Sequence, residues 1–225
     1  MSRPRLLDLY CGAGGAAMGY HRAGFDVVGV DIDPQPNYPF EFHQADALHA
    51  VEHNWQRFHA IHASPPCQRY SDLAHRNGNA DAWPDLVDKT RTVIEATGLP
   101  YVIENVEGAP LRDPITLCGT MFPELRVLRH RLFESNLPIA APPEHPPHPL
   151  VFTHDKRKKH YGLLDQDVDY VQVTGGGNAT LANKLDAMGC DWMTSHHQVN
   201  ESIPPAYTEF IGRQLLAHID AEVAA

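Results

Sequence analysis

A chain of 225 residues with 43% apolar residues fits one domain of ordinary size with a proper hydrophobic core. No apolar stretch approaches the length of about 20 residues that a bilayer span requires, and the N-terminus leads straight into a strand in place of a signal peptide, so we expect a cytoplasmic protein. The formal net charge of −10 argues against a strongly basic nucleic-acid binder and limits any nucleic-acid contact to a local patch.

The first apolar strand is followed by a glycine-rich loop. Residues 5–10 are expected to form this strand, residues 11–15 (Cys-Gly-Ala-Gly-Gly) turn out of it, and a helix starts at residue 16. A second strand over residues 26–31 ends at Asp31, about 20 residues after the loop, as in nucleotide-binding βαβ units whose acid holds the ribose hydroxyls. A plain tight turn is the alternative for the glycines, but the order of elements favours an α/β fold with a ligand site.

Cys67 follows a short apolar strand, expected over residues 58–63, and two prolines. Pro65 and Pro66 fix the backbone and present the cysteine in a defined direction just past the strand's C-terminal edge, where open α/β sheets bind ligands. A small buried thiol is the alternative, because most cysteines of intracellular proteins are of that kind.

Glu104 comes directly after another buried strand, expected over residues 101–103. An ionised carboxylate is costly beside apolar residues unless it is paired, so we expect Glu104 to be either paired or protonated. Both states are typical of a functional site, and capping of a following turn is the alternative.

Three motifs together resemble those of the DNA (cytosine-5)-methyltransferase family: Asp8-x-x-Cys11-Gly12-x-Gly14-Gly15, Pro65-Pro66-Cys67-Gln68 and Glu104-Asn105-Val106. The chain is similar to a small phage- or prophage-type member with a reduced target recognition region. The resemblance implies a class I S-adenosylmethionine-dependent methyltransferase fold, with a mostly parallel, Rossmann-like sheet and helices on both faces. It also implies methyl transfer from S-adenosylmethionine to C5 of a cytosine flipped out of double-stranded DNA, after cysteine attack at C6.

Other functions stay open beside this one. Cytosine-C5 enzymes that act on tRNA share the Pro-Pro-Cys and Glu-Asn-Val motifs. Enzymes that methylate an exocyclic nitrogen of cytosine or adenine carry an aromatic residue where this chain has Cys67, which disfavours them. A non-catalytic nucleic-acid-binding relative would have no need of Cys67, Glu104 and Arg131 together.

The resemblance assigns contacts with S-adenosylmethionine to one set of residues: Asp8, Tyr10, Cys11, Gly12, Gly14, Gly15, Asp31, Ile32, Asp46, Pro65 and Ser202. In this set Asp31 binds the ribose, Ile32 packs on the adenine and Asp46 reaches the adenine amino group. Asp46 is equally well placed to cap a helix that begins at the next residue.

The catalytic residues implied by the resemblance are Cys67, Glu104, Arg129 and Arg131. Residues 125–135 alternate as a strand does, which predicts that both arginines share a face and match the family's Arg-x-Arg element. Cys67 is the nucleophile, and we expect nearby positive charge or a helix N-terminus to lower its pKa. Glu104 donates from its protonated form to N3 of the base, and Arg131 binds O2.

Nucleic-acid contacts are expected from two polar segments: Gln68, Arg69 and Ser71, and the basic cluster Lys156, Arg157, Lys158 and Lys159. Residues 72–83 are too polar to pack and predict a mobile loop that closes over the flipped base. A solvated charge run without a role is the alternative for the basic cluster.

The expected organisation is a catalytic and cofactor-binding core over residues 1–136, a small target-recognition insert over residues 137–190, and a C-terminal segment over residues 191–225 that returns to the core. A proline-rich connector over residues 138–149 leaves the sheet. Helices are expected over residues 85–97, 181–188 and 206–217. We expect DNA as the partner, no membrane contact, and a monomer, in a bacterial or phage-infected cell.

No metal is predicted. The four cysteines lie far apart and form no Cys-x-x-Cys pair: Cys11, Cys67, Cys118 and Cys190. The scattered histidines of the region that follows the sheet lack the spacing of metal ligands. Free thiols in a reducing compartment fit this pattern best.

Overall fold

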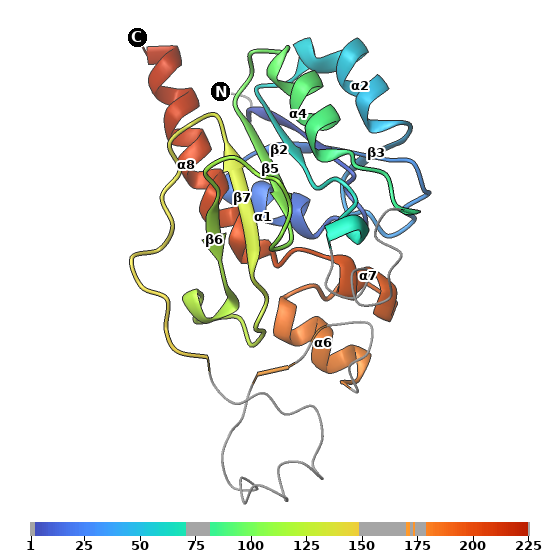
Figure 1. Ribbon diagram of the computed structural model, residues 1–225, viewed down its shortest axis with the longest axis vertical. Helices are drawn as coiled ribbons and strands as arrows, with labels where there is room; N and C mark the ends of the chain where they lie inside the picture. Colours follow the sequence, from blue (N-terminus) through green and yellow to red (C-terminus); the bar gives the residue numbers. More distant parts are fainter. Residues whose placement is uncertain (1–2, 71–81, 149–169, 172, 174–178, 225) are drawn as a thin grey trace, which may run out of the picture.

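The computed structural model describes residues 3–70, 82–148, 170–171, 173 and 179–224. Its centre is a seven-stranded sheet in the order β3-β2-β1-β4-β5-β7-β6 (Figure 1). The strands are β1 (Arg5–Leu9), β2 (Asp26–Asp31), β3 (Glu41–Gln44), β4 (Ala60–Ala63), β5 (Tyr101–Asn105), β6 (Ile115–Leu117) and β7 (Arg131–Ser135).

The first five strands run parallel, and β6 and β7 are antiparallel to their neighbours. The chain builds outward from β1 to β2 and β3 on one side, and then returns to place β4 and β5 on the other. Such a reversal opens a crevice at the carboxyl ends of β1 and β4, which is where doubly wound sheets bind ligands.

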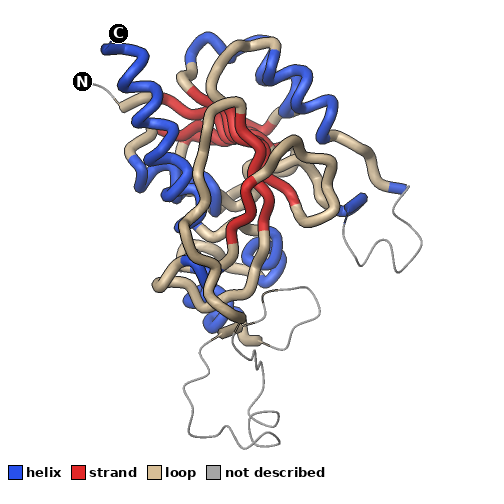
Figure 2. The backbone as a smooth tube through the Cα atoms, turned by 60° about the vertical axis from the view of Figure 1, so that its left-hand side comes forward, coloured by secondary structure: helices blue, strands red, loops and turns tan. Residues whose placement is uncertain are grey.

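Helices cover both faces of the sheet, as Figure 2 shows. One face carries α1 (Gly15–Ala23) and α8 (Pro205–Ala224), which pack closely against each other, and the other carries α2 (Ala47–Asn54) and α4 (Val87–Glu95). Each face has its own cluster of buried apolar side chains. The predicted α/β fold with helices on both faces is confirmed.

Three helices follow β7 in the described part of the chain. α6 (Leu181–Met188) and α7 (His196–Glu201) pack together below the carboxyl edge of the sheet (Figure 1), and α8 then runs back along α1. The predicted helix over residues 181–188 is confirmed, whereas α8 is longer than expected and α7 was not predicted. Short 3-10 turns occupy Trp55–Arg57, Gln68–Tyr70 and Gly119–Met121.

The strand predicted over residues 125–135 is shorter than the alternation indicated, since β7 begins only at Arg131. Before it, Val127 forms an isolated bridge to Val171, and Arg129 donates hydrogen bonds to carbonyls of other segments. The buried guanidinium of Arg129 needs several hydrogen-bond acceptors. Because these acceptors lie on other segments, the residues before Arg131 do not pair in the sheet. Within the described residues no helix has the length and apolarity that a membrane span requires.

Candidate active site

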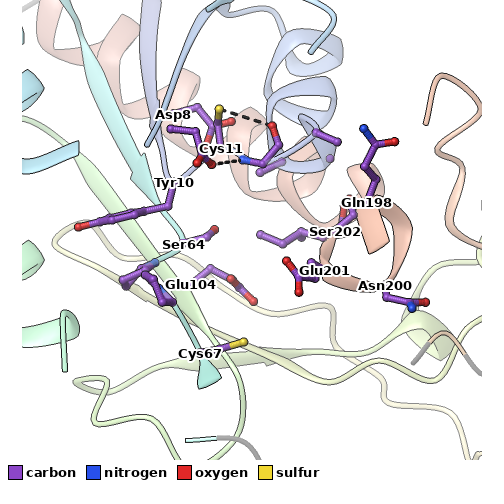
Figure 3. Close-up of a pocket in the computed structure, with 18 of the residues that line it drawn as sticks. Asp8, Tyr10, Cys11, Ser64, Cys67, Glu104, Gln198, Asn200, Glu201 and Ser202 are labelled. Atoms are coloured by element: carbon purple, nitrogen blue, oxygen red, sulfur yellow. Dashed lines mark hydrogen bonds between the residues drawn. The ribbon is translucent and has the colours of Figure 1, made fainter. Parts of the chain in front are cut away.

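A pocket of about 330 Å³ opens at the carboxyl ends of β1, β2, β4 and β5 (Figure 3). Six segments far apart in the sequence line it: the end of β1 with the glycine loop, the end of β2, the Pro-Pro-Cys loop, the end of β5, residues 129–131 and the stretch around α7. The lining includes Asp8, Tyr10, Cys11, Gly12, Gly15, Asp31, Ile32, Pro65, Cys67, Gln68, Glu104, Arg129, Arg131 and Ser202.

One end of the pocket is acidic. Asp31 accepts a hydrogen bond from the backbone amide of Gly12 (2.9 Å), so the carboxylate at the end of β2 holds the glycine loop in place. Gly12 has a φ of +49° and nothing within 4 Å of where a Cβ would stand, so its backbone faces open space. Burial raises the pKa of Asp8 to about 8, with Asp31 adding to the shift and a hydrogen bond from Tyr38 opposing it.

The C-terminal segment closes the pocket against the glycine loop. A Cβ at Gly15 would lie 1.9 Å from Oγ of Ser202 and 2.4 Å from the carbonyl oxygen of Ile203. Glycine is therefore required at this position by the close approach of the C-terminal segment. The indole of Trp192 adds a second tie by donating to the carbonyl of Ala13 (2.8 Å).

The other end of the pocket holds the thiol and a carboxyl group. Figure 3 shows Cys67 and Glu104 facing the same space, opposite Glu201 and Ser202. Asn105 donates from its side chain to the carbonyl of Pro65 (2.9 Å), so β5 holds the Pro-Pro-Cys loop in position.

Glu104 is buried and pairs with Arg131, whose Nε lies 2.9 Å from a carboxylate oxygen of Glu104. Burial raises the pKa of Glu104 above its ordinary value, although Arg131, Arg129 and a hydrogen bond from Ser64 act in the opposite direction. Glu104 was expected to be either paired or protonated. It has a charged partner, Arg131, and it also lies in an environment that favours the acid form.

A chain of buried hydrogen bonds supports Glu104 from beneath. The hydroxyl of Tyr20 lies 3.0 Å from Nδ1 of His62, and Nε2 of His62 lies 2.9 Å from Oγ of Ser64, which bonds to Glu104. Burial lowers the pKa of His62 to about 3, so the ring is neutral and offers one donor and one acceptor. Because Ser64 gives its proton to Glu104, it accepts from Nε2–H of His62, and Tyr20 donates to Nδ1.

Residues 4–114 match the model of a family described as C-5 cytosine-specific DNA methylase. This stretch, just under half of the chain, is similar to that family. The whole fold is also similar to two solved structures, each with a TM-score of 0.63 and each covering 97% of this chain and 99% of the other. One is described as a DNA modification methyltransferase encoded within an E. coli prophage (16% identity), and the other is the S. pombe Dnmt2 methyltransferase (14% identity).

Two curated relatives each align with just under half of the chain. The type II methyltransferase M.AquIA of Picosynechococcus is 31% identical over 121 residues, which cover 46% of this chain and 49% of that protein. The type II methyltransferase M.XorII of Xanthomonas oryzae pv. oryzae is 33% identical over 125 residues, which cover 48% of this chain and 29% of that protein. The matched part thus spans half or less of the length of these relatives.

Most residues predicted for the methylase site come together, and some do not. All four predicted catalytic residues line the pocket, as do nine of the eleven predicted cofactor residues. Gly14 and Asp46 do not line it: Gly14 faces Tyr38 and Pro39, and Asp46 caps α2 by accepting from the amide of His49 (2.9 Å). The structure therefore favours the helix-cap alternative for Asp46.

The predicted nucleic-acid residues separate in the same way. Gln68 lines the pocket, whereas Arg69 lies outside it, donates to the carbonyl of Trp83 (3.1 Å) and approaches Asp85 at 3.9 Å. Ser71 and the cluster Lys156, Arg157, Lys158 and Lys159 lie outside the described residues.

Arg129 is more deeply buried in the methylase pocket than the sequence indicated, with 7% of its surface exposed. Its guanidinium donates to the carbonyls of Val173 (2.9 Å) and Asn200 (2.5 Å), and within the described part of the chain its Nε has no hydrogen-bond partner. Burial lowers its pKa to about 9, and the charge of Arg131 adds to that shift. Arg129 thus joins the segment before β7 to the segments on either side of α6.

Sequence reasoning assigned no role to Ser64, His62 or Asn105, although each supports a residue that it did assign. Ser64 directly precedes the two prolines, and Asn105 stands in the middle of the Glu-Asn-Val motif. Their positions in or near the motifs were the available signal. Their contacts with Tyr20 on α1, Glu104 on β5 and Pro65 on the Pro-Pro-Cys loop form only in the folded chain.

The expected lowering of the Cys67 pKa is wrong. Burial raises the pKa of this thiol, the charge of Glu104 raises it further, and Arg131 and Arg129 offset only part of the effect. Buried thiolates are poorly solvated, so the apoprotein holds Cys67 mainly as the thiol at neutral pH.

We predict that iodoacetamide alkylates Cys67 more slowly than a free thiol near neutral pH, with a rate that is still rising above the ordinary cysteine pKa of 9.0. Glu104→Gln should shift this profile to lower pH, because it removes a negative charge. Mass spectrometry of the modified peptides measures the rate, and the buried Cys11 and Cys190 serve as internal controls. A profile centred below that of free cysteine would contradict the prediction.

Proposed function

We propose that this protein transfers a methyl group from S-adenosylmethionine to C5 of cytosine in DNA, through attack of Cys67 at C6 of a flipped-out base. The observation that carries the proposal is that Cys67, Glu104 and Arg131 line one pocket with the acid and glycine loop of the βαβ unit. The family of residues 4–114 supports DNA cytosine as the substrate.

The acidic end of the pocket fits S-adenosylmethionine. The molecule carries a sulfonium and an ammonium group, and Asp31 and Asp33 line this end together with Asp8, whose raised pKa a bound cation would lower. Beside them the apolar side chain of Ile32 is 63% exposed, so it can cover the face of a purine. When bound there, the cofactor supplies an electrophilic methyl group.

The thiol end of the pocket activates the base. C5 of cytosine is too weak a nucleophile by itself. A bond from Cys67 Sγ to C6 saturates C6 and moves the double bond to C4=C5, where conjugation with a nitrogen on C4 gives an enamine with a reactive C5. A protonated Glu104 donates to N3 as the ring gains electron density, and Arg131 stabilises O2. After methylation the C5 proton passes to water, the C5=C6 double bond forms again, and the C6–Sγ bond breaks so that Cys67 departs as a thiolate.

The two raised pKa values are complementary in this mechanism. While Glu104 is ionised, its charge opposes ionisation of Cys67. Protonation of Glu104 removes that charge and leaves the positive Arg131 beside the thiol. If the two groups share one proton and it resides on Glu104, then Glu104 is the neutral acid and Cys67 is the thiolate. These are the states that the reaction needs.

The burial of Glu104 requires the target base to leave its duplex. Glu104 lies at the bottom of the pocket with 6% of its surface exposed, so the edge of a stacked base cannot reach it. Gln68 at the pocket rim and Arg69 next to it are the described residues best placed to meet the sugar and phosphate of a flipped nucleotide.

The proposal is tested by incubating the protein with labelled S-adenosylmethionine and either duplex DNA or tRNA, and then separating the nucleosides. We expect 5-methylcytosine in the DNA arm. Label confined to tRNA would favour the RNA alternative. Label on an exocyclic nitrogen, or no transfer to either substrate from a protein that binds the cofactor, would reject the proposed chemistry.

Asp31→Ala is predicted to weaken S-adenosylmethionine binding by about 1.5–3 kcal/mol, the range for hydrogen bonds to a charged group. Calorimetry measures the change. Asp26→Ala is the matched control, because Asp26 lies at the opposite, exposed end of the same strand. Equal affinities for Asp31→Ala and the unsubstituted protein would show that the cofactor does not use this carboxylate.

A further inference from the structure

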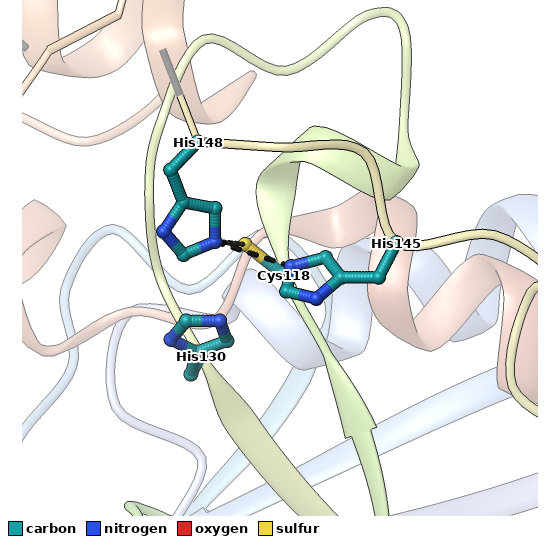
Figure 4. Close-up of side chains that lie close together, drawn as sticks. All are labelled: Cys118, His130, His145 and His148. Carbon is teal, nitrogen blue, oxygen red and sulfur yellow. Dashed lines mark hydrogen bonds between the residues drawn. The ribbon is translucent and has the colours of Figure 1, made fainter. Parts of the chain in front are cut away.

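Four side chains with metal-ligating atoms converge where β6 ends and β7 begins, and none of them belongs to the lining of the pocket described above. They are Cys118, His130, His145 and His148, and one potential ligand atom of each lies within 4.8 Å of the others (Figure 4). Cys118 follows β6 and is buried, His130 precedes β7, and the last two stand on the proline-rich connector.

The distances suit a tetrahedral ion. Sγ of Cys118 lies 3.5 Å from Nε2 of His148, which lies 3.1 Å from Nε2 of His145. Zinc bonds of about 2.0–2.3 Å to nitrogen and sulfur give a tetrahedron with edges of about 3.3–3.8 Å. Thiolate and imidazole together favour zinc among the divalent ions available to proteins.

Neighbouring groups support the four ligands in the way that metal sites require. Thr120 donates its hydroxyl to Sγ of Cys118 (3.5 Å), and Nδ1 of His130 lies 3.8 Å from a carboxylate oxygen of Glu107. A ligating histidine commonly directs its second nitrogen at a carboxylate, which fixes the ring and its tautomer. One thiolate and three neutral rings leave a zinc site with a charge of about +1, which Glu107 balances.

The sequence explains how the connector presents its two histidines. Pro146 and Pro147 separate His145 from His148, so the backbone between them is restricted and lacks two amide donors. This stiffness lowers the entropy lost when both rings bind one ion. The expectation of no metal rested on spacing along the chain, which does not register this cluster because Cys118 and His130 come from other segments.

We propose that Cys118, His130, His145 and His148 bind one structural zinc ion that fastens the proline-rich connector to the β6–β7 edge of the sheet. Four protein ligands leave no open position, so the ion has no catalytic role. His130 lies between Arg129 and Arg131, and its carbonyl accepts from Nη1 of Arg131 (2.8 Å). The ion therefore also steadies the segment that carries both arginines.

The test is zinc content and affinity of the full chain purified without chelators. We expect about one zinc ion per chain by elemental analysis. In competition with a chromophoric chelator, His145→Ala and His148→Ala should each bind zinc at least about tenfold more weakly. Both positions are exposed on the connector, so these variants are expected to fold.

His218→Ala is the matched control. His218 lies on α8, and its ring meets the carbonyl of Pro138 on the same connector (3.4 Å), but it is outside the cluster. Its zinc affinity should equal that of the unsubstituted protein. Equal affinity in His148→Ala and His218→Ala would overturn the proposal, since it would leave the cluster as a set of hydrogen-bonded side chains.

Cobalt substitution identifies the ligands without an activity assay. The Co²⁺ form should show the absorption of a four-coordinate ion together with thiolate-to-metal charge transfer, and Cys118→Ser should lose the charge-transfer band. Glu107→Gln should keep both features while binding zinc about tenfold more weakly. A cobalt complex without a thiolate band would also overturn the assignment.

Discussion

Replacing Cys67 with alanine is expected to lower the rate of methyl transfer at least about a thousandfold, as loss of an enzyme's nucleophile does. The affinity for S-adenosylmethionine should stay near that of the unsubstituted protein, because the acids proposed to bind the cofactor lie on β1, β2 and the loop after β2. Transfer is measured with labelled cofactor on duplex DNA, and binding is measured by calorimetry.

A covalent intermediate gives this prediction a second readout. DNA with fluorine at C5 of cytosine has no C5 proton to lose after methylation, so Cys67 cannot depart. The unsubstituted protein should therefore stay attached to such DNA on a denaturing gel, and Cys67→Ala should not. Near-normal transfer by Cys67→Ala would remove the covalent mechanism, while loss of cofactor binding would show that the substitution disturbs the whole pocket.

The parts of the fold that sequence reasoning predicted best are governed by local rules. β1, the glycine loop and β2 follow from apolar runs, turn residues and an acid at a set distance, and all three appear where expected. The carboxyl edge of a parallel sheet then brings Asp31, Cys67 and Glu104 into one pocket, because Asp31 and Glu104 lie at the carboxyl ends of β2 and β5 and Cys67 lies in the loop after β4.

What could not be predicted depends on contacts between distant segments. Arg129 leaves the strand pattern because its acceptors, Val173 and Asn200, are 44 and 71 residues away in the chain. The direction of the Cys67 pKa shift depends on how deeply the thiol is buried. The Pro-Pro-Cys motif does not predict that burial. The cluster of Cys118, His130, His145 and His148 was missed for the same reason, since these residues come close to one another only in the folded chain.

The largest effect on stability is expected at the buried ion pair of Arg91 and Glu134, which joins α4 to β7. Nε and Nη2 of Arg91 donate to the two carboxylate oxygens of Glu134 at 2.7 and 2.8 Å, and each side chain is only 2% exposed. Arg91→Leu should lower the free energy of unfolding by about 3–5 kcal/mol, because it leaves a buried carboxylate without its partner. Urea unfolding at neutral pH measures the change.

Arg112→Ala is the control for this substitution. Arg112 pairs with Glu95 at 2.9 Å, but their side chains are 63% and 43% exposed, so its loss should cost less than about 1 kcal/mol. Replacing both Arg91 and Glu134 with leucine should recover much of the stability lost in Arg91→Leu, because no buried charge is then unpaired. Similar losses for Arg91→Leu and Arg112→Ala would show that the buried pair adds no more than a surface pair.

The pH dependence gives the ion pair its own signature. Burial alone would raise the pKa of Glu134, but hydrogen bonds from Arg91 and from the amide of Arg112 outweigh it and hold the pKa below the ordinary value of 4.5. A carboxyl group whose pKa is lowered by folding stabilises the protein fully above its ordinary pKa, and that contribution is lost as the pH falls through the folded value. The unsubstituted protein should therefore lose more stability between neutral pH and acid than Arg91→Leu does, and equal acid sensitivity would contradict this account.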